Sequence, residues 1–161
     1  MPQGSPAPQI DIPLQFYHYG YGFYIAGRRS MEDVEVSPGT YLRPDMPAAV
    51  IFALASEEFL KCLLNRNNTP KTGHDLFYNL YTFLPRADKN GLKNLYKRYP
   101  GRDFEADLQL IAKYFPQLRY LHEYNITTWD SYTAGLVADT HCRYCAGLLG
   151  TTVLVDELGV S

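Results

Sequence analysis

The chain has 161 residues, of which 46% are hydrophobic and 20% charged, and its formal net charge is −2. This length and composition are typical of one globular domain, and no apolar run approaches the roughly 20 residues that span a bilayer. So small a net charge gives no global attraction for nucleic acid, and any such contact must be local. The first residues lack the pattern of a secretory signal, and three cysteines without framework spacing indicate reduced thiols. We therefore expect a cytoplasmic protein without a membrane segment.

Two segments near the start are predicted to lack regular secondary structure. Residues 1–13 carry four prolines, which indicates a disordered or extended lead-in. Residues 34–45 contain the turn-forming pair Pro38-Gly39 and a further proline, and are interpreted as a connecting loop. We place the helical domain at residues 14–150 and leave the tail, residues 151–161, unassigned.

Residues 14–33 are rich in tyrosine and fit two interpretations. Alternate aromatic side chains suggest a strand, whereas Tyr17, Tyr21 and Tyr24 keep the spacing of a helix. We predict the helix, because no second strand candidate of comparable strength is present to pair with it, and Gly20 would let another helix approach closely. Tyrosine is favoured at protein interfaces, so we expect this helix to form a two-fold dimer through its tyrosine-rich surface. The alternative is that the helix packs inside its own subunit.

The segment 47–64, PAAVIFALASEEFLKCLL, is apolar on nearly every side, which predicts a central helix with other helices packed around it. The exceptions are Glu57, Glu58 and Lys61, which form a small charged patch at i, i+3 and i+4 spacing. A carboxylate removed from water is costly unless it is paired. A cation from elsewhere in the chain is therefore expected to join this patch.

Four more helices are predicted downstream, which gives an all-α antiparallel bundle of five or six helices. Their predicted ranges are 73–84, 87–99, 103–122 and 131–149. The helix over 103–122 has the clearest amphipathic stripe in the chain. Pro116 lies inside it, and we expect a kink there because proline removes the hydrogen bond to the carbonyl group of Ala112.

Two residues outside the central segment could complete the charged patch. His74 is placed in the first turn of its predicted helix, where the helix dipole would keep the imidazole neutral, as suits a base or a structural cap. Arg119 could bind the carboxylate of Glu57 or Glu58 through two hydrogen bonds. The alternative is a surface pair between Arg119 and Glu123. We expect the first arrangement, because the stripe around Arg119 is apolar.

A second group of reactive side chains, His141, Cys142 and Cys145, lies in the last predicted helix. Tetrahedral zinc needs four ligands, and the one other cysteine is Cys62 in the central helix. We therefore interpret Cys142 and Cys145 as small buried residues and not as metal ligands. Neither a metal nor a cofactor is expected.

Three short motifs, taken in order along the chain, resemble the HEPN (higher eukaryotes and prokaryotes nucleotide-binding) superfamily. They are Glu57 or Glu58 with Leu60-Lys61, then His74-Asp75-Leu76, then Arg119-Tyr120 with Glu123. The resemblance covers roughly residues 46–124. It implies an antiparallel helical bundle, frequent homodimers and, in many members, metal-independent cleavage of RNA.

The same resemblance implies a function. We expect a nucleotide- or RNA-binding or protein-interaction module in a defence or toxin–antitoxin context, and a metal-independent ribonuclease is the alternative. The cleaving members carry an arginine followed four to six residues later by a histidine, whereas Arg119 and His122 have two residues between them. The catalytic candidates are His74, Arg119 and His122. The binding candidates are Glu57, Glu58, Lys61, Asp75, Tyr120 and Glu123.

Overall fold

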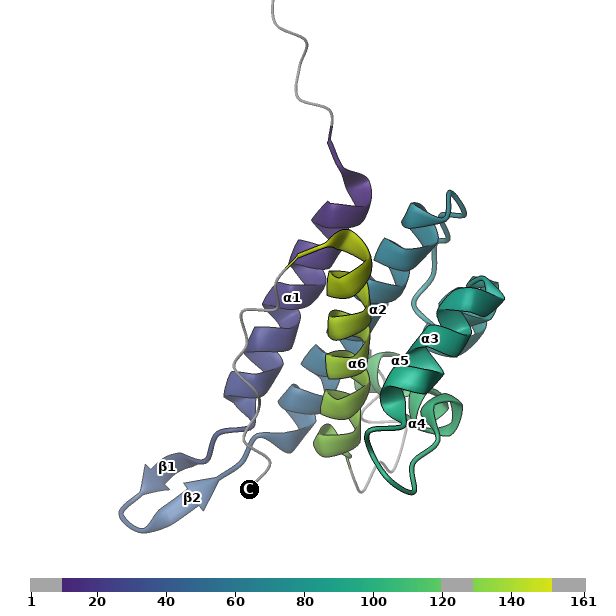
Figure 1. Ribbon diagram of the computed structural model, residues 1–161. Helices are drawn as coiled ribbons and strands as arrows, with labels where there is room; N and C mark the ends of the chain where they lie inside the picture. Colours follow the sequence, from purple (N-terminus) through teal and green to yellow (C-terminus); the bar gives the residue numbers. More distant parts are fainter. Residues whose placement is uncertain (1–9, 120–128, 152–161) are drawn as a thin grey trace, which may run out of the picture.

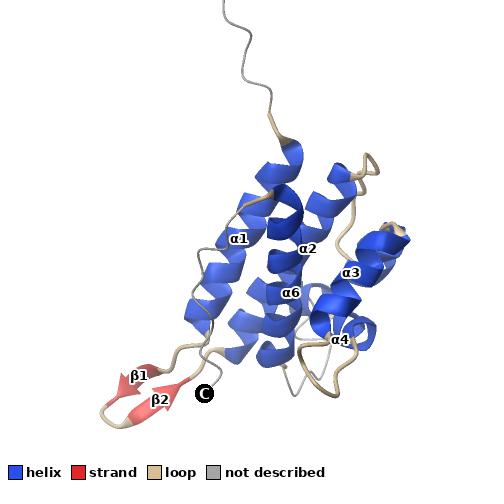
Figure 2. Cartoon of the chain, in the orientation of Figure 1, coloured by secondary structure: helices blue, strands red, loops and turns tan. Residues whose placement is uncertain are grey.

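The computed structural model describes residues 10–119 and 129–151, and these are mainly α-helical (Figures 1 and 2). The elements in chain order are α1 (Ile12–Ser30), β1 (Val34–Ser37), β2 (Thr40–Leu42), α2 (Asp45–Arg66), the π-helical turn η1 (Leu76–Leu80), the 3₁₀ turn η2 (Tyr81–Phe83), α3 (Arg86–Tyr96), α4 (Phe104–Ile111), α5 (Tyr114–Arg119) and α6 (Ser131–Leu149). Within the described ranges, six α-helices therefore accompany one short hairpin. The predicted all-α class is confirmed.

Helix α2 occupies the centre of the bundle, as its apolar sequence predicts. The three long helices α1, α2 and α6 pack side by side, and α1 runs antiparallel to the other two (Figure 1). Phe52, Leu60 and Cys62 of α2 are at most 2% exposed and point in different directions around the helix axis, so neighbours cover more than one side of this helix. Burial of that many apolar side chains is the main stabilising contribution to the fold. It also fixes the position of the polar residues that α2 carries.

Helix α1 begins earlier than predicted. The side chain of Asp11 accepts a hydrogen bond from the backbone N–H of Leu14 at 3.0 Å and so caps the helix, and Pro13 lies in the first turn, where a missing N–H costs nothing. The prediction of an extended lead-in is therefore wrong for residues 12 and 13. Residues 1–9 of that lead-in, like residues 152–161 of the tail, lie outside the described residues.

The tyrosines of α1 face the core of their own subunit. Tyr17 and Tyr24 are 4% and 1% exposed, and the ring of Tyr17 lies 5.8 Å from that of Phe59 on α2, measured between centroids. Gly20 and Gly27 allow this approach, because a Cβ atom at either position would overlap the ring of Phe59 or Phe52. The helix itself is confirmed, but the prediction that Tyr17 and Tyr24 form a dimer surface is wrong. The intrasubunit alternative holds.

Residues 34–42, within the loop predicted over residues 34–45, form a hairpin, and Asp45 already begins α2. Val34 pairs with Leu42 and Glu35 with Tyr41 in antiparallel register, and Gly39 supplies a φ of +74° in the turn. Every residue of both strands is exposed, so no buried face marks this hairpin in the hydrophobic pattern. The β-branched and aromatic residues were the available signal.

The predicted helix over residues 73–84 is two short turns instead. The N–H group of Tyr81 donates hydrogen bonds to the carbonyl groups of Leu76 and Phe77. The bond to Leu76 spans five residues, as in a π-helical turn, and η2 follows directly. The cap is Asp75, whose carboxylate accepts the N–H groups of Phe77 and Tyr78 at 2.9 and 2.7 Å. The placement of His74 inside a first helical turn is therefore wrong, because His74 precedes the cap.

The long helix predicted over residues 103–122 is broken into two, not kinked. Helix α4 ends at Ile111, and α5 begins at Tyr114, which places Pro116 in the first turn of a new helix. A proline ring clashes with the carbonyl group four residues earlier, here that of Ala112, so the chain leaves the helix at that residue. The rest of the predicted helix, residues 120–122, lies outside the described part of the chain.

Candidate functional site

The charged patch on α2 is present, and one of its three residues, Glu57, is deeply buried. Glu57 is 4% exposed, and its Oε1 lies 2.6 Å from Nζ of Lys61 on the same helix face. The Oε1 of Glu58 lies 4.0 Å from the same ammonium group. Spacings of three and four residues bring these side chains together on a helix. One of the cations that the buried carboxylate needs therefore comes from α2 itself.

His74 is the second partner of Glu57. Its Nδ1 lies 2.9 Å from Glu57 Oε1. Because a carboxylate only accepts hydrogen bonds, Nδ1 carries a proton and donates it to Glu57, and Nε2 is left outside this contact. The side chain of His74 is 58% exposed, whereas that of Glu57 is 5% exposed. We call Glu57, Lys61 and His74 the polar cluster. In it, the buried carboxylate of Glu57 holds the exposed imidazole of His74 at the surface.

The loop before η1 has features that fix the position of His74. Gly73 has a φ of +121°, a backbone conformation that residues with a side chain rarely adopt, and a Cβ atom there would lie 2.6 Å from Nδ2 of Asn79. On the other side Asp75 is held by the two backbone hydrogen bonds of its cap. Asp75, a predicted binding residue, thus serves the backbone. The ring of His74 also lies 5.6 Å from that of Phe115 on α5, between centroids.

The second carboxyl group of the patch is electrostatically unfavourable. Burial raises the pKa of Glu58 above its ordinary value, and Lys61 and His74 oppose this shift only in part. The negative charge of Glu57 adds to the increase. Glu58 is therefore the member of the patch whose charge is least well compensated.

Helix α5 packs against α2, and its Phe115 lies beside His74. It ends at Arg119, but the side chain of Arg119 is not among those described. Tyr120, His122 and Glu123, three further candidates, lie outside the described residues. The pairing of Arg119 with Glu57 or Glu58 stays a prediction, as do the roles of these three residues.

The cysteines and His141 are buried and far from solvent. Cys62, Cys142 and Cys145 are free thiols, and burial raises the pKa of Cys142 to about 12. A thiol must lose its proton to bind a metal, so this environment disfavours ligation. Among residues 10–119 and 129–151, no group of three or more His, Cys, Asp or Glu side chains is placed to hold a metal ion. The surroundings agree with the interpretation of Cys142 and Cys145 as buried packing residues.

A further polar network was missed from the sequence. Asp139 of α6 is 4% exposed and accepts hydrogen bonds from the hydroxyl groups of Tyr24 and Tyr99, at 2.8 and 3.0 Å, and from Nε of Arg143. It ties together α1, the segment after α3, and α6. Arg98 Nη1 lies 3.8 Å from the same carboxylate. The spacing of four residues between Asp139 and Arg143 was the one available sequence signal.

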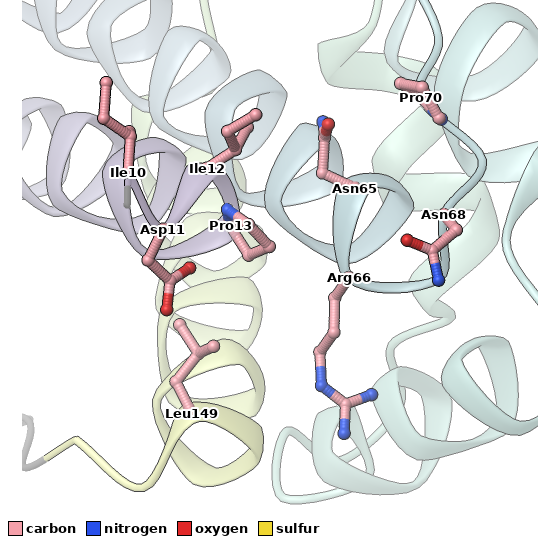
Figure 3. Close-up of a pocket in the computed structure, with 9 residues that line it drawn as sticks. All are labelled: Ile10, Asp11, Ile12, Pro13, Asn65, Arg66, Asn68, Pro70 and Leu149. Atoms are coloured by element: carbon pink, nitrogen blue, oxygen red, sulfur yellow. The ribbon is translucent and has the colours of Figure 1, made fainter. Parts of the chain in front are cut away.

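A surface pocket of about 760 Å³ lies at one end of the bundle and contains none of the predicted site residues. Its lining comes from the start of α1, the end of α2 with the loop after it, and the end of α6 (Figure 3). Arg66 is the one cation in its lining, and Asp11 is already engaged as the cap of α1. We therefore place the candidate functional site at the polar cluster.

In the described ranges, no helix combines the length and the apolar character needed to cross a membrane. Comparison of the chain with protein-family models, with curated proteins and with solved structures finds no match. The functional assignment therefore rests on the geometry of the polar cluster and on the sequence resemblance.

Proposed function

We propose that this chain is a HEPN-like helical module that contacts a nucleotide or RNA through the polar cluster. The observation that carries the proposal is the imidazole of His74, exposed at the surface but held from behind by the buried carboxylate of Glu57 at 2.9 Å. A surface side chain with a preset orientation loses less conformational entropy when a ligand binds. It is therefore suited to recognition.

The cluster offers a ligand two kinds of contact. Nε2 of His74 is available to accept or, when protonated, to donate a hydrogen bond, and the ammonium group of Lys61, which is paired with Glu57 and 16% exposed, is a second hydrogen-bond donor in the cluster. Both groups suit phosphate oxygens or base edges. A module that binds a protein through the same cluster is the other form of this proposal.

A metal-independent ribonuclease is the second candidate. A carboxylate that orients an imidazole through one nitrogen leaves the other nitrogen to act as a general base, and Glu57 and His74 have this arrangement. In such a reaction His74 would take the proton of the ribose 2′-hydroxyl group. The arginine and histidine spacing of the cleaving relatives is missing, so binding without cleavage is the first proposal.

Fluorescence anisotropy with labelled single-stranded RNA and with a labelled nucleotide tests the proposal. His74→Ala should weaken binding by about tenfold or more, equivalent to about 1.4 kcal/mol. His18→Ala is the matched control, since His18 is an exposed histidine on α1 outside the cluster. No binding by the intact chain, or equal binding by both variants, would refute it. Cleavage of the same RNA in the presence of a chelator, lost in His74→Ala, would favour the ribonuclease.

A further inference from the structure

The β1–β2 hairpin presents an apolar surface that nothing in the described part of the chain covers. Val34, Val36, Tyr41 and Leu42 are between 52% and 63% exposed. Val34 and Leu42 are cross-strand partners, so their side chains share one face. Figure 2 shows the hairpin projecting from one end of the helical bundle. An isolated two-stranded hairpin is marginally stable in water, and an exposed apolar patch of this kind typically marks an interface.

The hairpin is also acidic. Residues 32–43 contain three acidic residues and one basic residue, which leaves a net charge of −2. Arg43 pairs with Asp33 at 2.9 Å, and the Oε1 atom of Glu35 accepts the N–H of Gly39 within the turn. Glu32 completes the acidic set. A partner surface for this hairpin should therefore be apolar and positively charged.

A groove with these two properties lies between α3 and α6. It has a volume of about 480 Å³, and Leu95, Tyr144 and Leu148 form much of its apolar lining. Gly147 faces the open space of the groove, where a Cβ atom would meet nothing within 4 Å. Gly91 lines the same groove, and its missing side chain lets the ring of Tyr144 approach α3.

Basic side chains border this groove. Arg143 lines it, and Lys97 lies beside it, with Nζ 2.9 Å from Oδ1 of the lining residue Asn94. Arg98 approaches Arg143 through their shared partner Asp139. Among the described residues, the acidic side chains that contact the lining are Asp139 and Asp88, both buried; Asp139 pairs with Arg143, and Asp88 accepts a hydrogen bond from the hydroxyl group of Tyr144. The accessible charge at the groove is therefore positive.

We propose that the β1–β2 hairpin of one copy of this chain docks into the α3–α6 groove of a second copy. The hairpin matches the groove in both polarity and charge, and charge complementarity of this kind sets the register of an interface. Within one chain the hairpin and α3 lie on opposite sides of the bundle (Figure 1), so a hairpin that docks into the groove comes from another copy. Reciprocal docking gives a two-fold dimer with two equivalent contacts. Neither surface includes the polar cluster, so this proposal is independent of the proposed function.

The RNA alternative for the groove is less favourable. A site for single-stranded RNA combines positive charge with aromatic rings on which bases stack. The aromatic residue in this groove is Tyr144, which is half-buried and has its hydroxyl group bound to Asp88. An apolar lining of leucines instead suits apolar side chains such as Val34 and Leu42.

Sedimentation equilibrium with two single variants tests the docking. Leu42→Lys removes an apolar side chain from the hairpin and reduces the net charge of residues 32–43 from −2 to −1, and Gly147→Glu fills the groove with an acidic side chain. Each should raise the dimer Kd by about tenfold or more. The matched controls are Leu110→Lys, at an exposed leucine of α4, and Gly22→Glu, at a helical glycine of α1 with equally open surroundings. Both controls should dimerise like the intact chain.

Mixing the two interface variants makes the test specific. A mixed pair keeps one intact hairpin and one intact groove, so a heterodimer should form where neither variant self-associates. Circular dichroism checks that each variant is folded, and Val34→Lys replaces Leu42→Lys if the latter is not. The proposal is overturned if the intact chain is monomeric at high micromolar concentration, if folded variants dimerise like the controls, or if mixing restores nothing. A monomer that instead binds RNA or an acidic peptide through the groove would also overturn it.

Discussion

Two glycines of α1, two residues apart, should respond differently to substitution by alanine. Gly20 faces α2, and a Cβ atom there would lie 2.8 Å from Cδ1 and Cε1 of Phe59. Gly22 faces solvent, and a Cβ atom there would meet nothing within 4 Å. The ring of Phe59 is fully buried and contacts Tyr17, so it has no free space into which to move. The two substitutions therefore differ in packing and not in backbone preference.

The magnitude follows from two opposing effects. Replacing glycine by alanine inside a helix stabilises it by about 1 kcal/mol at either position. Overpacking a filled core costs about 1–3 kcal/mol, and this cost applies only at Gly20. Gly22→Ala should therefore raise the free energy of unfolding by about 1 kcal/mol. The free energy of unfolding of Gly20→Ala should be about 1–3 kcal/mol lower than that of Gly22→Ala, because both variants gain the same helix preference and only Gly20→Ala overpacks the core.

Urea denaturation followed by circular dichroism measures both variants against the intact chain. The slope with denaturant should stay the same, so that midpoints report stability. Equal stabilisation by both substitutions would refute the close packing of α1 on α2. It would also weaken the placement of the polar cluster, because the packing of α2 fixes Glu57 and Lys61.

Three further predictions concern ionisable groups. Because the pKa of Glu58 is raised in the folded state, its contribution to stability is present below the unfolded pKa and is lost as pH rises through the folded pKa. Glu58→Gln should therefore be more stable than the intact chain at neutral pH, and its urea midpoint should change less with pH. Burial lowers the pKa of His141 to about 3, so the folded state should lose about 2 kcal/mol between about pH 7.5 and about pH 5, as the unfolded chain takes up a proton. His141→Leu, which removes the titratable ring and at most one hydrogen bond to the backbone of Val137, should lose less over that interval, and an equal loss would contradict a buried neutral imidazole. Glu57 keeps Lys61 and His74 as partners, so Arg119→Ala should lower stability, by about 3 kcal/mol, only if Arg119 pairs with the incompletely compensated Glu58. An unchanged melting temperature with lost RNA binding would instead indicate a ligand contact, and no change in either would make Arg119 a surface residue.

Local sequence patterns determined the helical class and the principal helices of this protein. The all-round apolarity of residues 47–64 predicted the central helix α2, and the last helix was predicted with the bounds it has, Ser131–Leu149. The association of Glu57 with Lys61 also followed from spacing alone, because neighbours on one helix face are set by 3.6 residues per turn. In each case the signal lies within a few turns of chain.

Only the tertiary structure decided which side chains meet between elements. The hairpin has no buried face, so no alternating pattern of burial marked it, and the π-helical turn at Leu76–Leu80 has no recognisable period. The burial of Tyr17 and Tyr24 depends on where Phe52 and Phe59 of α2 lie, and composition cannot tell a core tyrosine from an interface tyrosine.

The polar groups show the same division. The sequence by itself determined that Glu57 needs a cation, because a buried carboxylate without one is costly, and it offered His74 and Arg119 as partners. The contact between Glu57 and His74 depends on the loop conformation at Gly73, which no periodic pattern encodes. The hydrogen bonds that Asp139 accepts from Tyr24 and Tyr99 join residues 115 and 40 positions apart. Such contacts arise from packing between distant segments, and local periodicity carries no information about them.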